Sequence, residues 1–209
     1  MNLLHNAAGV FVTGTDTGVG KTIASAVLVR ALHAHYWKPA QTGLADERGD
    51  SETVAQLTQL HPNHLHAPRY ALQASLAPLA AAELERVTIS LEDFTLPQTH
   101  GDKIVVEGAG GVLVPLAPGV LMVDLMRKLG LPVVLVAGTG LGTINHTLLS
   151  IEALRARDIE ICGVLFSGEE NLGNQETIAE LGKVNILGRI PVLAPLDTHS
   201  VAHAAHALS

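Results

Sequence analysis

The sequence predicts an α/β fold built on a doubly wound, mostly parallel sheet with helices on both faces. Four short apolar runs, rich in β-branched residues, predict strands that are buried on both faces of a sheet. These runs are residues 10–12, 104–106, 133–136 and 161–166, with weaker candidates at 36–38 and 186–190. Stretches of helical character alternate with them, at residues 22–34, 51–60, 76–85, 123–129, 147–157 and 175–181. Such alternation predicts right-handed crossover connections between parallel strands.

Size and composition favour a single domain spanning residues 1–209. The chain has 209 residues, of which 47% are apolar and only 3% aromatic, a balance that suits helices packed on a sheet. Glycine and proline separate the expected elements, as at Gly130, Pro132 and Pro191. We find no linker long or polar enough to divide the chain into domains.

Charge and cysteine content restrict the expected partners. The net charge of −7 argues against broad electrostatic binding to nucleic acid or to an anionic membrane, so neither is expected as a partner. The single cysteine, Cys162, cannot form an intrachain disulfide and lies in an apolar run, where a core thiol is expected. Because no leader or membrane-spanning segment is apparent, we expect a cytoplasmic protein.

Residues 14–22 are the strongest local signal for a nucleotide site, because they follow the first expected strand and precede a helix. Backbone N–H groups of such a loop face phosphate oxygens, and the helix dipole favours the anion. Lys21 would reach the terminal phosphates, and the Thr22 hydroxyl would ligate magnesium. The segment therefore predicts a P-loop NTPase type of fold. Its spacing departs from the common motif, since five residues instead of four separate Gly14 from Gly20.

Three more polar segments follow expected strands, at the edge where doubly wound sheets bind ligands. They are residues 38–43, 107–111 and 138–146. Each alone is as compatible with an ordinary loop as with a site, but together they are expected to converge beside the phosphate loop. The last of them ends at a helix start whose free N–H groups can bind a carboxylate, and there His146 is assigned no catalytic role.

Two carboxylates are candidates for a magnesium site with Thr22. Glu107 follows an apolar strand, whereas Asp50 either caps the expected helix 51–60 or ligates the metal. Together the three side chains would give a hard cation oxygen ligands. The histidines of residues 61–66 fit no closed ligand set, and a solvated loop is expected there.

Taken in order, four segments resemble dethiobiotin synthetase. They are residues 14–22 with their five-residue spacing, Lys38-Pro39 followed by Thr42-Gly43, residues 107–111 and residues 141–146. The resemblance spans about residues 9–195 and implies an ATP- and Mg²⁺-dependent cyclo-ligase of biotin biosynthesis. The implied substrates are 7,8-diaminononanoate, CO₂ and ATP. They would form a carbamate, then a carbamic-phosphoric anhydride, and finally the ureido ring of dethiobiotin.

The resemblance also implies roles for individual residues. Lys38 would stabilise the carbamate and the transferring phosphoryl group, Lys21 would hold the phosphates, and Thr17 and Thr42 would line the reacting centre. The metal ligands would be Thr22, Asp50 and Glu107. The nucleotide site would further include Gly18, Val19, Gly20, Ile23, Gly108, Ala109 and Gly110, with Ser167, Gly168, Pro191, Val192 and Leu193 beside the base. A homodimer is implied, in which the substrate's carboxylate binds a helix start of the other subunit formed by Thr143, Ile144 and Asn145.

Two departures from the family pattern and two alternatives remain open. Gly18 stands where many members have an acidic residue, and Ser167-Gly168 replaces an Asn-Asp pair that reads adenine, so other nucleoside triphosphates are possible substrates. A regulatory ATPase of the partition and septum-placement type would carry an extra lysine early in the loop, where this chain has Asp16. Its frequent membrane helix would need a basic face, which residues 197–209 lack. A glutamine-using amidoligase would need a nucleophilic cysteine, but Cys162 lies in an expected strand.

Overall fold

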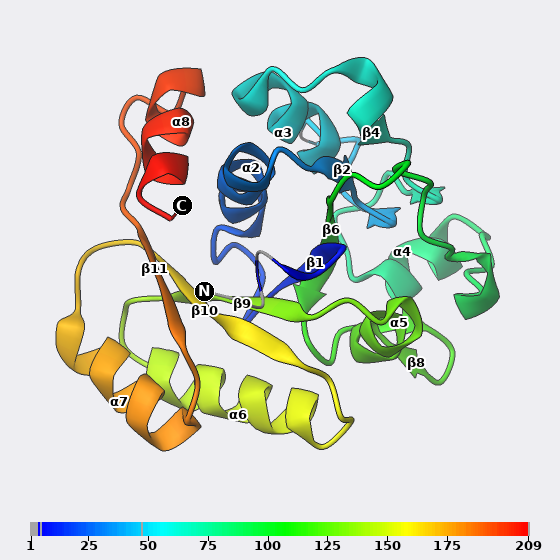
Figure 1. Cartoon of the computed structure of the whole chain (residues 1–209). Coiled ribbons are helices and arrows are strands. Elements are labelled where there is room, and N and C mark those ends of the chain that lie inside the picture. Colours follow the sequence, from blue (N-terminus) through cyan, green and yellow to red (C-terminus); the bar gives the residue numbers. More distant parts are fainter. Residues whose placement is uncertain (1–3, 5, 47, 209) are drawn as a thin grey trace.

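A seven-stranded parallel sheet forms the centre of the computed structural model, which describes residues 4, 6–46 and 48–208 (Figure 1). The strand order is β11-β10-β9-β1-β6-β2-β4, and every pair of neighbours is parallel. The strands are β1 (Gly9–Gly14), β2 (His35–Trp37), β4 (Leu65–His66), β6 (Ile104–Gly111), β9 (Val133–Gly138), β10 (Ile161–Ser167) and β11 (Ile186–Ile190).

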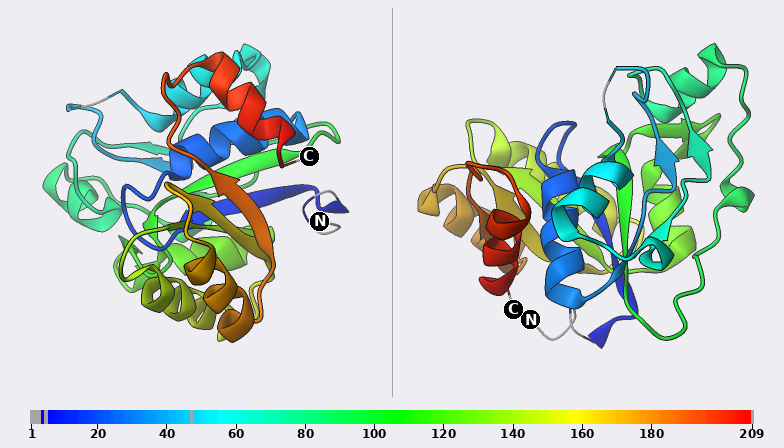
Figure 2. Two further views of the ribbon diagram at one scale, coloured as in Figure 1. Left: turned by 90° about the vertical axis from the view of Figure 1, so that its left-hand side faces the viewer. Right: turned by 90° about the horizontal axis from the view of Figure 1, so that it is seen from above.

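Helices cover both faces of this sheet, as Figure 2 shows. One face carries α2 (Lys21–Leu32), α3 (Asp50–Thr58) and α8 (Thr198–His206). The other carries α4 (Pro78–Leu84), α5 (Met122–Leu129), α6 (Thr143–Arg155) and α7 (Leu172–Gly182). The predicted doubly wound α/β class is therefore confirmed. None of the described helices is long and apolar enough to cross a membrane.

Short elements complete the described part of the chain. β3 (Ala40–Gln41) and β5 (Tyr70–Ala71) pair in parallel, while β7 (Pro115–Ala117) and β8 (Val120–Leu121) form an antiparallel pair. Two 3₁₀ turns, η1 (Pro62–His64) and η2 (Leu91–Asp93), lie in the connections before β4 and β6.

Successive side chains of β1 enter two different cores. Val10 and Val12 pack among side chains of α2 and α8, whereas Phe11 packs with α5 and α6, and all three are fully buried. Because both faces are covered, the strand is continuously apolar instead of alternating. Cys162 is buried in the same way, and burial raises the pKa of its thiol to about 11, as expected of a core residue.

The path of the chain around β1 creates a crevice. From β1 the chain crosses β6 to reach β2, whereas from β6 it crosses β1 to reach β9 on the other side. In open α/β sheets, ligands bind outside the carboxyl ends of the strands at such a reversal. A ligand site is therefore expected at the carboxyl edge of β1 and β6.

The structure corrects three local predictions and adds a helix. Residues 107–111 are not a loop, because β6 continues through them and its end still pairs with β1. The N-cap of α3 is Gly49, so Asp50 is the first helical residue and its carboxylate is not a cap. Within residues 61–66, where a solvated loop is predicted, residues 62–66 form η1 and β4. Finally, α8 follows the last strand, where the sequence predicts no element.

Candidate active site

The phosphate loop joins β1 to α2 at the carboxyl edge of the sheet. Gly18 and Gly20 have φ angles of 75° and 94°, in the region that favours glycine. A Cβ on Gly20 would also lie 2.4 Å from Ser167 Oγ, so the loop passes too close to β10 for a larger residue. The N-cap of α2 makes no side-chain hydrogen bond, which leaves the first N–H groups of the helix available to an anion.

Lys21 is buried beneath this loop. It is 7% exposed, and its Nζ donates a hydrogen bond of 2.9 Å to the carbonyl oxygen of Asp16. Burial, and secondly repulsion by Lys38, lowers the pKa of Lys21 to about 8, although nearby carboxylates act in the opposite direction. A phosphate beside it would favour the charged form again.

Lys38 joins two carboxylates just beyond the end of β2. Its Nζ lies 2.5 Å from Asp50 Oδ2 and 2.9 Å from Glu107 Oε1. Lys38 is 4% exposed and Glu107 only 1%, so the charges interact where water screens them little. Burial alone would lower the pKa of Lys38, but the charges of Glu107 and Asp50 more than offset this and raise it. Lys38 is therefore a cation at neutral pH.

The two carboxylates have further partners that fix their orientation. Tyr36 donates from its hydroxyl to Glu107 Oε2 at 2.9 Å, and burial followed by the charge of Glu107 raises the pKa of that tyrosine well above its usual value. Burial would raise the pKa of Asp50, but Lys38 outweighs it and the pKa is lowered. The backbone N–H of Asp50 donates to Gln41 Oε1 at 3.0 Å. The carboxylate of Glu107 is thus held by a hydrogen bond as well as by charge, and the backbone of Asp50 is fixed at the start of α3.

Thr22, Asp50 and Glu107 form a compact set of oxygen atoms. The Thr22 hydroxyl donates to Asp50 Oδ1 at 2.7 Å and lies 3.2 Å from Glu107 Oε1. Hydroxyl and carboxylate oxygens are the ligands that a hard cation such as Mg²⁺ prefers. The donor chemistry therefore fits a divalent cation at this point, with Lys38 as the counter-charge in the present conformation.

A cavity of about 590 Å³ opens beside this cluster. Its lining contains polar side chains from the phosphate loop, from the segment after β2, from the start of α3 and from the segment between β5 and α4. They include Thr17, Gln41, Thr42, Arg48, Asp50 and Ser75, together with Ala109 and Gly110 of β6. The cavity is large enough for a small organic substrate.

Residues expected beside the base lie at the ends of β10 and β11. Ser167 ends β10 and approaches Gly20, while the carbonyl oxygen of Gly168 accepts a 2.9 Å hydrogen bond from Arg189. Pro191 and Val192 follow β11 and are exposed. This part of the edge offers a hydroxyl, backbone groups and apolar side chains.

The helix start at Thr143 lies apart from the 590 Å³ cavity. Its cap, Gly142, provides no side-chain hydrogen bond, and Thr143 donates from its hydroxyl to the carbonyl oxygen of Gly138 at 2.6 Å. Thr143, Ile144 and Asn145 line a separate hollow of about 450 Å³, and none of them lines the cavity of Thr17 and Thr42. Within one chain, these two predicted parts of the substrate site are not brought together.

The structure also contains site residues that sequence reasoning missed. Tyr36 holds Glu107, Gln41 holds the start of α3, and Arg48 and Ser75 line the cavity. Tyr36 and Gln41 lie within three residues of Lys38 in the sequence, and this proximity is the one feature that could have indicated them. Arg48 and Ser75 lie in connecting segments without a motif.

The chain matches a family model described as AAA domain over residues 8–200. A bifunctional protein of Bordetella avium named biotin biosynthesis bifunctional protein BioCD is 58% identical over 193 residues. That match covers 92% of this chain but 41% of the Bordetella protein, so the chain spans less than half of that relative's length.

Other relatives match along nearly their whole length. A Nitrobacter hamburgensis protein named ATP-dependent dethiobiotin synthetase BioD is 48% identical over 195 residues, which cover 93% of this chain and 91% of that protein. A protein of the same name from Rhodopseudomonas palustris BisA53 is 51% identical, with the same coverage.

Two solved structures with a similar fold carry other names. A ParA family ATPase from Chlorobium tepidum has a TM-score of 0.56 at 13% identity and covers 98% of this chain and 100% of its own. The Aquifex aeolicus MinC:MinD cell division protein complex has a TM-score of 0.57, also at 13% identity, covering 95% of this chain and 94% of the other. At such low identity, these structures show a shared fold alone.

Proposed function

The chain belongs to the ATP-dependent dethiobiotin synthetase family, and we propose that its cluster of Lys38, Asp50 and Glu107 serves ureido ring closure. On this family membership, it is a cyclo-ligase of biotin biosynthesis that uses ATP. One observation carries the assignment of the site. A buried lysine bridges two carboxylates within reach of a phosphate loop and beside a polar cavity.

The reaction balances in three steps. One amine of 7,8-diaminononanoate attacks the carbon of CO₂ and loses a proton, which gives a carbamate. A carbamate oxygen then takes the γ-phosphoryl group of ATP, with ADP leaving, and a carbamic-phosphoric anhydride forms. The second amine attacks the carbonyl carbon, the C–O bond to phosphate breaks, and the amine loses its proton as the ring closes.

Lys38 and Lys21 supply the positive charge for these steps. Both the carbamate and the transferring phosphoryl group are anionic, so the barrier depends chiefly on positioning and charge neutralisation. We assign Lys38 to the carbamate and the transferring phosphoryl group, and Lys21 to the phosphates in the loop. Thr17 and Thr42 line the same cavity, where their hydroxyls orient the diamine and the carbamate.

We propose that Thr22, Asp50 and Glu107 hold Mg²⁺. The oxygen donors and their 2.7 and 3.2 Å separations support this assignment. When bound, Mg²⁺ neutralises charge on the phosphate oxygens of ATP. The carboxylates that would ligate it also bind Lys38, so the metal and the lysine share one pair of negative charges.

The nucleotide is assigned to the loop and the neighbouring strand ends. Gly18, Val19, Gly20 and Ile23 are assigned to the triphosphate with Lys21 and Thr22. Gly108 is assigned to the nucleotide site together with Ala109 and Gly110, which line the cavity from β6. The base would lie beside Ser167, Gly168, Pro191, Val192 and Leu193. Since these residues present no side-chain amide to the base, we propose that nucleoside triphosphates other than ATP also serve.

A homodimer would complete the substrate site. Thr143, Ile144 and Asn145 lie outside the cavity of their own chain, yet they form an uncapped helix start that suits the carboxylate of the diamine. Large apolar side chains are exposed near them, with Leu141 at 108% and Leu149 at 56%. Such exposure supports an interface on this side of α6.

Mixing two damaged variants tests whether subunits share the site. Lys38→Ala removes the lysine, and Asn145→Asp places a negative charge where the substrate's carboxylate would bind. If each site combines Lys38 of one subunit with Asn145 of the other, random heterodimers contain one intact site, and about a quarter of wild-type activity returns. If both residues act within one chain, every site in the mixture keeps a lesion and activity stays low.

Two broader assignments complete the proposal. We propose that the chain acts as one domain, because α8, the last described helix, shares a hydrophobic core with α2, the helix that follows the phosphate loop. We also propose a cytoplasmic location, where ATP is available, with no nucleic-acid or membrane partner.

Product formation tests the function. The protein is incubated with the diamine, bicarbonate, Mg²⁺ and ATP, and both phosphate and ureido product are measured. The proposal requires phosphate release that depends on the diamine and equals product formation. Phosphate release at the same rate with and without the diamine would instead support a regulatory ATPase.

A further inference from the structure

A second cluster of ionisable side chains lies at the opposite edge of the sheet, where β2, β4 and β6 begin. His35 opens β2, His64 ends η1 just before β4, and Asp102 precedes β6. These strands are parallel, and the phosphate loop lies at their carboxyl ends. The cluster at their amino ends is therefore at the opposite edge of the sheet from the proposed ATP site. The proposed reaction assigns no role to these three residues.

His35 carries a buried nitrogen atom without a hydrogen bond. The residue is 5% exposed, and its Nδ1 lies 2.9 Å from His66 Nε2. Its Nε2 has no hydrogen-bond partner in the described part of the chain, although Asp102 Oδ2 is 3.5 Å away. A buried polar atom left unpaired in this way is unfavourable and calls for an explanation.

His35, His64 and Asp102 each bring a potential metal ligand to this place. Ligand atoms of His35, His64 and Asp102 all lie within 4.8 Å of one another. We propose that these residues bind a divalent transition-metal ion, with zinc as the occupant. The ion would satisfy His35 Nε2 and the carboxylate of Asp102 together, and water would complete the coordination.

The donor chemistry selects this class of metal. Two imidazoles and one carboxylate suit zinc better than a hard cation such as Mg²⁺, which prefers oxygen ligands alone. Burial lowers the pKa of His35, which favours the neutral imidazole that a metal requires. His66 contacts the other ring nitrogen of His35 and would orient the ligand, as outer partners of zinc ligands commonly do.

Closing the site requires His64 to reorient. Zinc bonds of roughly 2.0–2.2 Å place tetrahedral ligand atoms about 3.3–3.6 Å apart, a spacing that His35 and Asp102 already have. The ring of His64 is stacked on that of His35, with centroids 4.1 Å apart and planes at 19°, and it must tilt to present its nitrogen.

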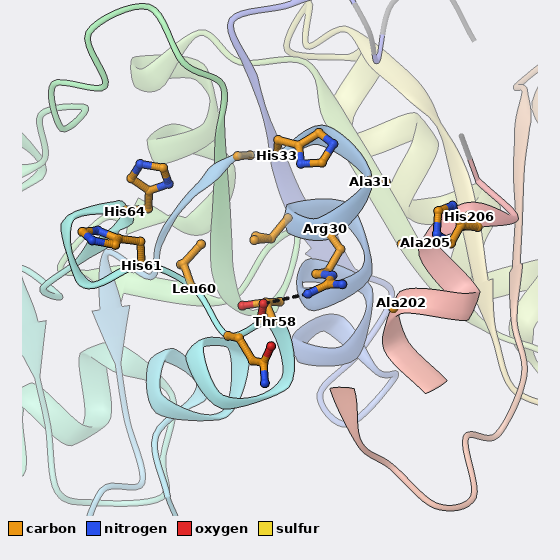
Figure 3. Close-up of a pocket in the computed structure, with 13 residues that line it drawn as sticks. Arg30, Ala31, His33, Thr58, Leu60, His61, His64, Ala202, Ala205 and His206 are labelled. Carbon is orange, nitrogen blue, oxygen red and sulfur yellow. Dashed lines mark hydrogen bonds between the residues drawn. The ribbon is translucent and has the colours of Figure 1, made fainter. Parts of the chain in front are cut away.

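His64 has room for this movement. It is half-buried and lines a cavity of about 560 Å³ between α2, the segment after α3, and α8. Figure 3 shows His64 and His61 on one side of that cavity and His206 of α8 on the other. Of the three proposed ligands, His64 is the one that lines this cavity.

Zinc binding to variants of the full chain tests the proposal. Metal-free protein is titrated with Zn²⁺ by calorimetry, with Mg²⁺ in excess to occupy the carboxylates of the ATP site. The variants are His64→Gln and Asp102→Asn, whose side chains are accessible enough that folding should survive. His206→Gln is the matched control, since it lines the same cavity but belongs to no ligand set. A second titration with Co²⁺ records the visible absorption of a low-coordinate imidazole complex.

We expect one zinc ion per wild-type chain, an affinity lower by at least about tenfold in both ligand variants, and an unchanged affinity in His206→Gln. The cobalt absorption should disappear with His64→Gln. Equal affinities in the wild type and the two ligand variants would overturn the proposal. The proposal would also fail if His206→Gln lowered the affinity for zinc as much as His64→Gln and Asp102→Asn do. It would fail too if Glu107→Gln abolished zinc binding while His64→Gln left it intact.

Discussion

Replacing Lys38 by methionine separates its structural role from its chemical one. Methionine nearly preserves the side-chain volume but removes the charge that bridges Asp50 and Glu107. Removing one partner of a buried ion pair typically costs about 3–5 kcal/mol. Glu107 keeps the hydrogen bond from Tyr36 and Asp50 keeps the one from Thr22, so we expect a cost at the lower end of this range, about 3 kcal/mol. Lys128→Met, which breaks an exposed pair with Glu92, should cost at most about 1 kcal/mol.

Magnesium should reverse much of that loss in stability. If the carboxylates hold Mg²⁺, as proposed, the ion must compete with Lys38 for them in the wild type, whereas Lys38→Met leaves them without a bridging cation. At about a hundred times its dissociation constant, a bound ion stabilises the folded state by about 2.7 kcal/mol. Turnover should nevertheless stay below that of the wild type by a factor of about 10² or more, since the ammonium group assigned to the carbamate is then missing.

The assay compares urea unfolding of the wild type, Lys38→Met and Lys128→Met, with and without Mg²⁺, alongside turnover at saturating substrates. The central reasoning would be refuted if Lys38→Met resembled Lys128→Met in stability, or if its turnover were near normal. Equal stabilisation of wild type and Lys38→Met by Mg²⁺ would show that the lysine and the metal do not share the carboxylates.

Three further predictions address the metal, the nucleotide and pH. Asp50→Asn and Glu107→Gln should each raise the Mg²⁺ concentration for half-maximal turnover by about tenfold or more, because an amide is a poorer ligand for a hard cation. Because Ser167 and Gly168 offer the base no side-chain amide, CTP or GTP should support turnover within about tenfold of ATP, a gap of about 1.4 kcal/mol. Since the pKa of Lys21 is lowered to about 8, the free protein loses this charge as pH rises, and affinity for a non-hydrolysable ATP analogue should fall about tenfold per pH unit above that value.

Each of these has a contradicting outcome. An unchanged magnesium titration in Asp50→Asn would reduce Asp50 to a partner of Lys38. A preference for ATP above about a hundredfold would mean that backbone groups near residues 191–193 read the base. Lys21→Arg stays charged and should bind the analogue equally at about pH 7 and pH 9, so a matching decline in that variant would assign the pH dependence to another group.

Much of the fold follows from the sequence because the main strands are buried on both faces. Their continuous apolar runs appear in the structure as β1, β6, β9 and β10, each one or more residues longer than predicted. The two-residue strands β3, β4 and β5 are too short to show any periodicity. Helix α8 was not predictable in the same way, since its alanines and histidines carry little apolar pattern, and its buried Val201 is recognisable only once it packs on α2.

The candidate site was predictable where parallel strands force convergence. Lys38 directly follows β2 and Glu107 lies at the matching position inside the neighbouring β6, since Trp37 pairs with Val106, so their 2.9 Å contact follows from topology. The choice between a cap and a ligand for Asp50 depended on where α3 begins, to within one residue, which sequence patterns do not resolve. The cluster around His35 was missed because its members come from three distant segments that only tertiary packing brings together.

The route of one oxygen atom tests the central claim most directly. If a carbamate is phosphorylated, the oxygen that joins carbon to phosphorus comes from CO₂ and leaves with the phosphate. A single turnover is therefore run with ¹⁸O-labelled CO₂ in unlabelled water, quickly enough to precede exchange, and the phosphate is examined by mass spectrometry. We expect one labelled oxygen in each phosphate released with product. Product formation with unlabelled phosphate would contradict phosphorylation of a carbamate at this site.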